Sequence, residues 1–155
     1  VPGLAVTTDV IVGFPGETEQ EFVQSAAFVR GLDFMKLHVF RYSVRLGTAA
    51  ARMPNHVPPE AMKVRSAALL ALSDAGSRRY AARWLGREVD VLWEQVAGAS
   101  ESGFLNTGLT DTYVRVHMTD PLPLTNTLSR VRVTGLAEGG VTAVPVEARR
   151  TQEAR

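Results

Sequence analysis

The residue types that could bind a ligand gather in a short turn near the N-terminus. Gly13, Pro15 and Gly16 follow an apolar run, and Glu17 comes directly after them. Glycines would let a ligand approach the backbone, and the helix start expected after Thr18 would favour a negative charge. The same residues also suit an ordinary tight turn, so on their own they leave both interpretations open.

A second polar group, Tyr42, Ser43 and Arg45, ends the next apolar run. If that run is a parallel strand, these residues lie at its C-terminal end, where α/β proteins place their active sites. The guanidinium of Arg45 could clamp a carboxylate or contact RNA, and the alternative is a solvated ion pair. For Ile11 and His38 we favour core positions, with a ligand-facing role as the alternative.

Acid–base catalysis and metal binding are not indicated. Glu21 lies three residues after Thr18, the spacing of a capping box, so we assign it to helix capping. Glu17 is a candidate contact for the polar edge of a ligand. The chain has three His and no Cys, which excludes disulfides, cysteine nucleophiles and cysteine-held iron–sulfur clusters within it. We therefore predict no catalytic residue and no metal ligand.

Basic residues are candidates for contact with RNA. The most basic stretch comprises Lys63, Arg65, Arg78, Arg79, Arg83 and Arg87. These side chains could contact phosphates, but an exposed, solvated helix face is the interpretation that we favour for the stretch as a whole. Arg79 is kept among the candidate RNA contacts.

In the second half, aromatic and basic residues alternate with apolar ones. Tyr113, Arg115 and His117 fall opposite the apolar residues 114, 116 and 118, and Arg130 and Arg132 fall opposite residues 131 and 133. Such side chains on a small barrel suit stacking and backbone contacts with single-stranded RNA, and the alternative is a solvated strand face. Residues 85–155 hold seven basic and nine acidic residues, which argues against a strong electrostatic grip.

The elements that position these residues begin with the pattern of a βαβ unit. Residues 6–12 form an apolar, β-branched strand, and residues 35–43 form a second one. Between them, residues 18–30 have helical spacing of apolar residues, and Gly31 is the expected helix-ending residue. This order predicts a parallel pair with a right-handed crossover. An irregular loop over 43–59 then leads to a helix over about 59–85 that begins at Pro59.

After residue 85 the pattern changes to alternation. Apolar residues recur with period two near residues 89–93, 114–118, 131–133 and 144–146. Short strands at this spacing predict a small β-barrel or sandwich. The two strands and two helices of the first half leave sheet edges open and helix faces uncovered, so we expect them to need further neighbours.

Composition bounds the class of protein. The chain has 155 residues, of which 45% are hydrophobic and 21% charged, and its net charge is +1. This composition is typical of a core-forming domain, and no apolar run is long enough for a membrane span. The sequence begins at Val1 without a signal-peptide pattern, which we interpret as the start of a piece of a longer protein.

Over nearly its whole length, the chain resembles the radical S-adenosylmethionine methylthiotransferases. The segment Asp9–Glu17 (DVIVGFPGE) resembles their fifth-strand motif. The likeness continues through Lys36–Thr48 (KLHVFRYSVRLGT) and Ala51–Pro58 (ARMPNHVP), although Arg41 stands where this family usually has Pro. The second half is similar to the TRAM domain of these enzymes, on the segments Gly86–Glu94 (GREVDVLWE), Gly108–Val116 (GLTDTYVRV) and Arg130–Gly135 (RVRVTG).

The resemblance implies the architecture and the partners. Residues 1–58 would be an α/β fragment, the C-terminal part of a radical (βα) barrel, residues 59–85 a connecting helix, residues 86–148 a small all-β OB-like TRAM barrel and residues 149–155 a disordered tail. The full-length enzyme would use S-adenosylmethionine and two 4Fe–4S clusters, whose ligands this chain lacks. A tRNA anticodon stem-loop, the missing N-terminal portion of the same protein and a cytoplasmic location are also implied.

Together, the residues and the resemblance give two sets of site residues. The cofactor set is Ile11, Gly13, Pro15, Gly16, Glu17, Tyr42, Ser43 and Arg45. The RNA set is Tyr113, Arg115, Arg130, Arg132 and Arg79.

The form of the motifs is most similar to the branch that adds a methylthio group at C2 of N6-threonylcarbamoyladenosine, at tRNA position 37. The isopentenyladenosine and ribosomal-protein branches are alternatives, as is a free-standing RNA-binding module. A phosphate-binding α/β protein ranks last, because the turn lacks a Walker-type Lys and a Rossmann glycine triplet. Without Cys, we expect this polypeptide alone to be catalytically inactive.

Overall fold

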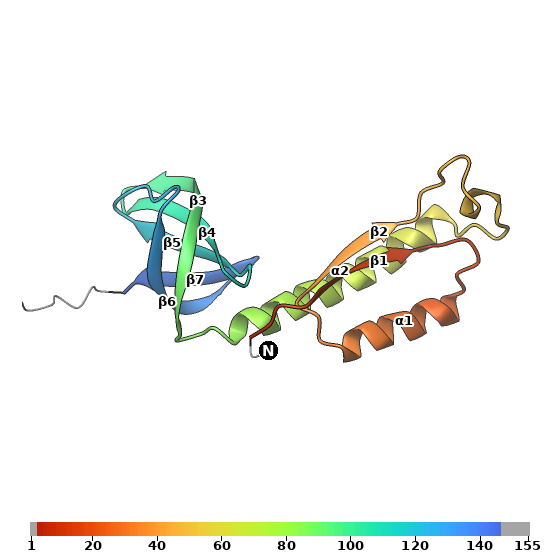
Figure 1. Ribbon diagram of the computed structural model, residues 1–155, viewed down its shortest axis with the longest axis horizontal. Coiled ribbons are helices and arrows are strands. Elements are labelled where there is room, and N and C mark those ends of the chain that lie inside the picture. The colour runs from red at the N-terminus through yellow and green to blue at the C-terminus, as the bar shows by residue number, and fades with distance from the viewer. Residues whose placement is uncertain (1–2, 147–155) are drawn as a thin grey trace, which may run out of the picture. The chain divides into compact units, whose positions relative to one another are not determined.

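The computed structural model describes residues 3–146, and Figure 1 shows its elements. The chain divides into two compact units, the first formed by Leu4–Tyr80 and the second mainly by residues from Ala81 onward. The tail predicted for residues 149–155 lies outside the described residues. None of the helices in residues 3–146 is both long and apolar enough to cross a membrane.

The first unit contains the predicted βαβ arrangement. The strands β1 (Thr7–Val12) and β2 (Lys36–Arg41) pair in parallel, from Thr7 opposite Lys36 to Val12 opposite Arg41. The helix α1 (Glu19–Gly31) connects them, and η1 (Ala50–Arg52) and α2 (Pro59–Ala82) follow. Helix α2 begins at Pro59, as predicted, because the first helical turn does not need its missing N–H.

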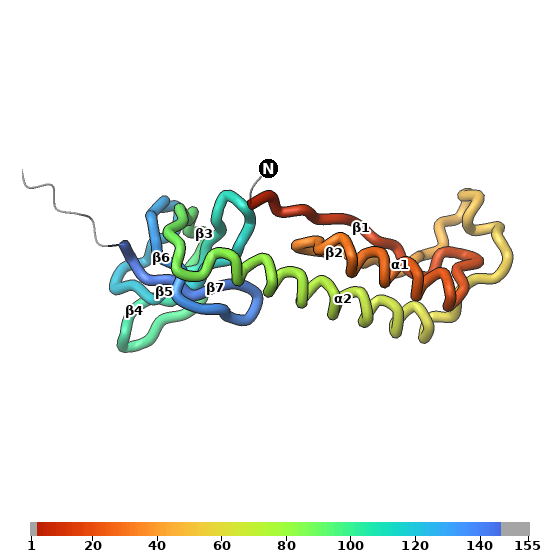
Figure 2. Tube along the Cα trace, turned by 90° about the horizontal axis from the view of Figure 1, so that it is seen from below, coloured from red at the N-terminus to blue at the C-terminus, as the bar shows by residue number. Residues whose placement is uncertain are grey.

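Helix α2 covers part of the edge of β2 that is not paired with β1. The Ser73 hydroxyl oxygen accepts a 2.9 Å hydrogen bond from the backbone N–H of Leu37, and the Ser77 hydroxyl donates to the carbonyl of Met35 at 2.8 Å. Figure 2 shows α2 running alongside both strands. The expectation of open sheet edges is therefore wrong only at Leu37 of β2 and at Met35 just before it, where two helix hydroxyls take the place of a strand partner.

The core of the first unit lies on one face of the sheet. It is formed by Val12 and Leu37 from the strands, Phe22 from α1 and Leu69 from α2. Side chains alternate between the faces of a strand, so the burial of Val12 turns Ile11 to the opposite face. Ile11 is 56% exposed, and the core position that we favoured for it is therefore wrong for the described residues.

Helix α1 ends beyond the predicted residue. Gly31 is still helical, and the left-handed conformation expected of it falls on Asp33, which has a φ of 52°. Aspartate is one of the few residues that adopt this conformation readily. Its carboxylate also accepts a 2.9 Å hydrogen bond from Nε of Arg79. The prediction that Gly31 terminates the helix is therefore wrong, because the chain turns at an anchored aspartate instead.

The second unit is a closed five-stranded barrel, so the prediction of a small β-barrel is confirmed. Its strands are β3 (Glu88–Ser100), β4 (Gly103–Thr110), β5 (Arg115–Asp120), β6 (Leu128–Ala137) and β7 (Gly140–Pro145). They close in the order β3-β4-β5-β7-β6. The β5–β7 pair is parallel and the other pairs are antiparallel.

The barrel interior follows the predicted alternation in three strands and departs from it in a fourth. Fully buried side chains include Val91 and Trp93 of β3, Val116 of β5, and Val131 and Val133 of β6. In β7 the inward-facing residues are Val141 and Ala143, whereas Val144 is 46% exposed. The prediction that Val144 and Val146 form the buried face is therefore wrong by one residue. A shift of one residue along a strand exchanges its inward-facing and outward-facing side chains.

Strand β4 was missed because its inward residues are not apolar. Asn106 is fully buried, and its side chain forms three hydrogen bonds to backbone groups. Gly108 is also buried, and a Cβ there would collide with the carbonyl oxygen of Leu92 on β3. A polar residue and a glycine at inward positions hide the alternation that identifies a strand.

Candidate functional site

The turn after β1 requires its glycines for conformational reasons. Gly13 has a φ of 77° and Gly16 a φ of 89°, both in the left-handed region. The Gly16 N–H donates to the carbonyl of Asn55 at 2.9 Å, and the Glu17 N–H donates to the carbonyl of Phe14 at 2.9 Å. The turn is therefore held both by its own backbone and by the loop before α2.

The two glycines differ in the space that surrounds them. A Cβ at Gly13 would collide with the side chain of Met62 on α2, so the missing side chain of Gly13 accommodates α2. A Cβ at Gly16 would meet nothing within 4 Å, and Pro15 between them is buried. The space through which a ligand could approach the backbone is therefore open at Gly16, whereas at Gly13 it is filled by the side chain of Met62.

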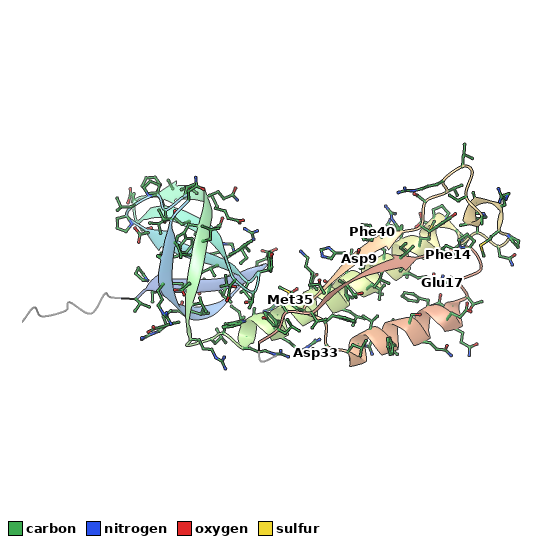
Figure 3. The ribbon with its side chains drawn as sticks, viewed as in Figure 1. Asp9, Phe14, Glu17, Asp33, Met35 and Phe40 are labelled. Atoms are coloured by element: carbon green, nitrogen blue, oxygen red, sulfur yellow. The ribbon has the colours of Figure 1, made fainter. Side chains whose placement is uncertain are left out.

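Glu17 lies on the inner side of this turn and binds within the chain. Its Oε2 accepts a 2.7 Å hydrogen bond from the Gly13 N–H and a 2.6 Å bond from Nη1 of Arg65. Arg65 also donates to the Glu17 carbonyl at 3.1 Å and, through Nη2, to Glu19 at 3.1 Å. Figure 3 shows Glu17 and Phe14 at the end of β1 from which the turn departs.

Arg65 corrects our interpretation of the basic stretch. Only 6% of this residue is exposed, and its guanidinium carbon lies 5.4 Å from the centre of the Phe22 ring. Burial alone would lower the pKa of Arg65, but the hydrogen bonds and charges of Glu17 and Glu19 outweigh burial and raise it. The expectation that Arg65 lies on a solvated face or contacts phosphates is wrong, because two carboxylates hold it inside the unit.

The start of α1 satisfies its own backbone donors, as the capping box predicts. The Glu21 N–H donates to the Thr18 hydroxyl at 3.2 Å, and the Thr18 N–H donates to Glu21 Oε2 at 2.8 Å. These hydrogen bonds to Thr18 lower the pKa of Glu21. The negative charge favoured at this helix start is thus supplied by the protein's own carboxylates.

Of the polar group predicted after the second strand (Tyr42, Ser43 and Arg45), only Tyr42 contacts the turn. The Tyr42 N–H donates to the carbonyl of Val12 at 2.9 Å, and its ring packs edge-on against Phe14 with centroids 5.4 Å apart. The Tyr42 hydroxyl is buried and has no hydrogen-bond partner among the described residues. Ser43 and Arg45 lie in the exposed loop that follows.

The exposed face of the two-stranded sheet carries four residues that could contact a ligand. Asp9 lies opposite His38, and Ile11 lies opposite Phe40, which is 52% exposed. The core position favoured for His38 is wrong, because its alternation with buried Leu37 turns it outward. We did not predict Asp9, although a single acidic residue within an apolar strand was a signal that could have identified it.

Four of the five candidate RNA contacts are exposed, Arg115 is half-buried, and the arginines among them are paired with acids. Arg115 lies 3.4 Å from Glu94, and Arg79 lies 2.9 Å from Asp33. Tyr113 is 73% exposed in the turn after β4, with a φ of 61°. His117, which falls on the same side of β5 as Arg115, is half-buried, and its Nε2 has no partner in the described part of the chain.

Glu88 organises the remaining two arginines on the outside of β3 and β6. Its carboxylate lies 2.8 Å from Arg132 and 3.4 Å from Arg130, and Arg130 also lies 3.9 Å from Asp90. The hydrogen bond from Arg132 is the main cause that lowers the pKa of Glu88. This pairing neutralises the arginines, so the barrel presents them as a mixed-charge surface.

Residues 3–146 contain no group of His and acidic side chains that could hold a metal ion.

Comparison with known proteins identifies the family. No protein-family model matches the chain. The threonylcarbamoyladenosine tRNA methylthiotransferase of Bacillus subtilis is 43% identical over 116 residues, which is 75% of this chain and 26% of the relative. A tRNA-2-methylthio-N(6)-dimethylallyladenosine synthase of Thermobifida fusca is 44% identical over 65% of this chain and 20% of the relative.

A third relative acts on a protein. The ribosomal protein uS12 methylthiotransferase of Syntrophobacter fumaroxidans is 47% identical over 61% of this chain and 21% of the relative. All three names describe methylthiotransferase chemistry, on two modified adenosines and one ribosomal protein. The chain therefore belongs to the methylthiotransferase family, and it spans about a quarter or less of the length of these curated relatives.

Proposed function

We propose that this chain is the C-terminal portion of a tRNA methylthiotransferase that modifies N6-threonylcarbamoyladenosine at position 37 by radical S-adenosylmethionine chemistry. The observation that carries the proposal is the 43% identity to the Bacillus subtilis enzyme over 116 residues, a longer match than those to the dimethylallyladenosine and ribosomal-protein relatives. Those two relatives have similar identities, so their substrates are the alternatives.

In this proposal, the first unit contributes one side of the pocket for S-adenosylmethionine, which supplies the methyl group and the radical when bound. The open backbone at Gly16, the unpartnered Tyr42 hydroxyl and the exposed side chain of Ile11 fit a ligand with polar and flat apolar parts. Ser43 and Arg45 extend this surface. Gly13, Pro15 and Glu17 shape the turn from within, because they are packed or hydrogen-bonded inside the chain.

The iron–sulfur clusters do not fit this chain. A 4Fe–4S cluster is held by cysteine thiolates, and the sequence contains none. The proposal therefore assigns both clusters to an N-terminal portion of the same protein, and it assigns no catalytic step to this chain alone.

The second unit is proposed to hold the tRNA anticodon stem-loop as a TRAM domain. Tyr113 supports this role, because exposed aromatic rings stack on unpaired bases. Arg130, Arg132 and Arg79 are exposed and Arg115 is half-buried, but each would have to exchange its acidic partner for a phosphate. We therefore expect binding to depend more on stacking than on net charge.

A chimera tests the proposed function. The Bacillus subtilis enzyme would carry this chain in place of its matching segment, and tRNA from cells that lack their own enzyme would be analysed by mass spectrometry. Methylthiolation of threonylcarbamoyladenosine supports the proposal. Modification of dimethylallyladenosine or of the ribosomal protein alone would reassign the branch. An inactive chimera whose fold is intact would contradict the enzyme role and favour an RNA-binding module.

A further inference from the structure

Arg65 joins three segments that are distant in the sequence. From α2 it reaches the carboxylate and the carbonyl of Glu17 in the turn, the carboxylate of Glu19 at the start of α1, and the ring of Phe22. Glu17 passes this connection on to the end of β1 through the N–H of Gly13. One side chain thus ties the strand end, the turn and both helices together.

The geometry of this cluster requires a guanidinium. The Arg65 side chain is only 7% exposed, and it contacts Glu17 through Nη1 and Glu19 through Nη2, a two-nitrogen fork that the single nitrogen of a lysine does not reproduce. Without Arg65, Glu17 would be a largely buried carboxylate whose remaining hydrogen-bond partner among the described residues is the Gly13 N–H. Such a charge is costly, so the turn would rearrange to reach water.

The cluster lies behind the open side of the turn. Gly13 faces α2 through Met62, whereas Gly16 and the half-exposed Phe14 face away from the packed side. Because the Arg65 side chain is 7% exposed and is engaged by Glu17 and Glu19, it would act on a ligand at Gly16 through Glu17.

We propose that Arg65 is a positioning residue that fixes the Gly13–Glu17 turn through Glu17 and so sets the affinity of the methylthiotransferase for S-adenosylmethionine. The part that concerns the cofactor rests on the proposed function. The part that concerns the turn does not, so separate experiments address the two.

The first experiment uses the full chain and measures amide hydrogen exchange by NMR. We expect Arg65→Met to accelerate exchange of the Gly13 amide by about 10- to 100-fold, because hydrogen bonds to charged groups are among the stronger ones. Amides in the middle of α2 should keep their protection. Arg79→Met is the matched control, because it breaks an exposed Arg–Asp pair on the same helix and should leave Gly13 unchanged.

A second variant keeps the test informative if Arg65→Met fails to fold. Glu17→Gln keeps an oxygen that can accept from Gly13 but removes the charge that Arg65 pairs with. We expect a smaller acceleration than in Arg65→Met, and Arg65→Lys should lie between Arg65→Met and the unchanged chain. If Gly13 exchanges within about twofold of the unchanged chain in both Arg65→Met and Glu17→Gln, the positioning role is overturned.

The second experiment uses the chimera and separates KM from kcat. Arg65→Met should raise KM for S-adenosylmethionine by about tenfold or more and lower kcat much less, because the interaction shapes binding. Arg30→Met removes an exposed arginine of α1 and should change neither constant. An unchanged KM in an active chimera overturns the cofactor part. An inactive unsubstituted chimera contradicts the proposed function, and the exchange data still decide the role of Arg65 in the turn.

Discussion

Asn106 offers a direct test of how the barrel is held together. Its side chain is fully buried on β4, where Nδ2 donates to the carbonyls of Phe104 and Leu122, both at 3.1 Å. Its Oδ1 accepts from the N–H of Leu124 at 2.9 Å. Asn106 therefore anchors the connection between β5 and β6 to the interior of the barrel.

Replacing Asn106 with Ala removes three hydrogen bonds from a site that water does not reach. At about 1 kcal/mol net for each bond, the free energy of unfolding should fall by about 3 kcal/mol. This is a large fraction of the stability of a unit this small, since folded proteins retain only about 0.05–0.15 kcal/mol per residue. Asn106→Asp should cost at least as much at pH 7, because it sets a carboxylate oxygen against two carbonyl oxygens.

The assay is urea denaturation followed by tryptophan fluorescence. Trp84 and Trp93 are the two tryptophans of the chain, and both belong to the second unit, so the signal reports the barrel. Thr119→Ala is the control, because it shortens an exposed polar residue of β5. An Asn106→Ala transition within about 0.5 kcal/mol of the unchanged chain, at an unchanged slope, would refute the reasoning that these bonds stabilise the barrel.

Three further predictions concern single positions. Arg132 and Arg130 lower the pKa of Glu88 in the folded chain. The stability that Glu88 adds is therefore complete above the ordinary pKa of 4.5 and is lost as the pH falls below that value. Glu88→Gln should flatten that part of a profile of Tm against pH. Gly108→Ala should abolish the cooperative urea transition because its Cβ would collide with β3, whereas Gly98→Ala, which meets nothing within 4 Å, should be nearly neutral. Tyr113→Ala should weaken binding of the full chain to an anticodon stem-loop by about tenfold in fluorescence anisotropy at fixed salt, and unchanged binding would remove the stacking role.

Local signals made much of the first unit predictable. The capping box of Thr18 and Glu21 and the helix start at Pro59 depend on residues a few positions apart, and the structure confirms both. The parallel pairing of β1 with β2 was predictable because a strand, a helix and a strand in close succession have few other arrangements. The alternation of apolar and polar side chains in three barrel strands was also predictable, because it depends on residues only two positions apart.

The candidate site was less predictable, because its contacts join distant residues. The sequence marked the turn glycines but could not distinguish Gly13, whose space α2 fills, from Gly16, whose space is open. It also placed Ile11 and His38 in the core, because a two-stranded sheet with both helices on one face is not visible in the residues of one strand.

The sequence by itself determined where the two long helices begin, that the chain holds no cysteine, and which motifs it shares with methylthiotransferases. Only the tertiary structure decided that Arg65 is buried while Arg79 is exposed, although both are arginines on one helix. It also decided that Asn106 belongs in a barrel core. The physical reason is that the burial of a charged or polar group depends on its hydrogen-bond partners, and these come from other elements that only folding brings within reach.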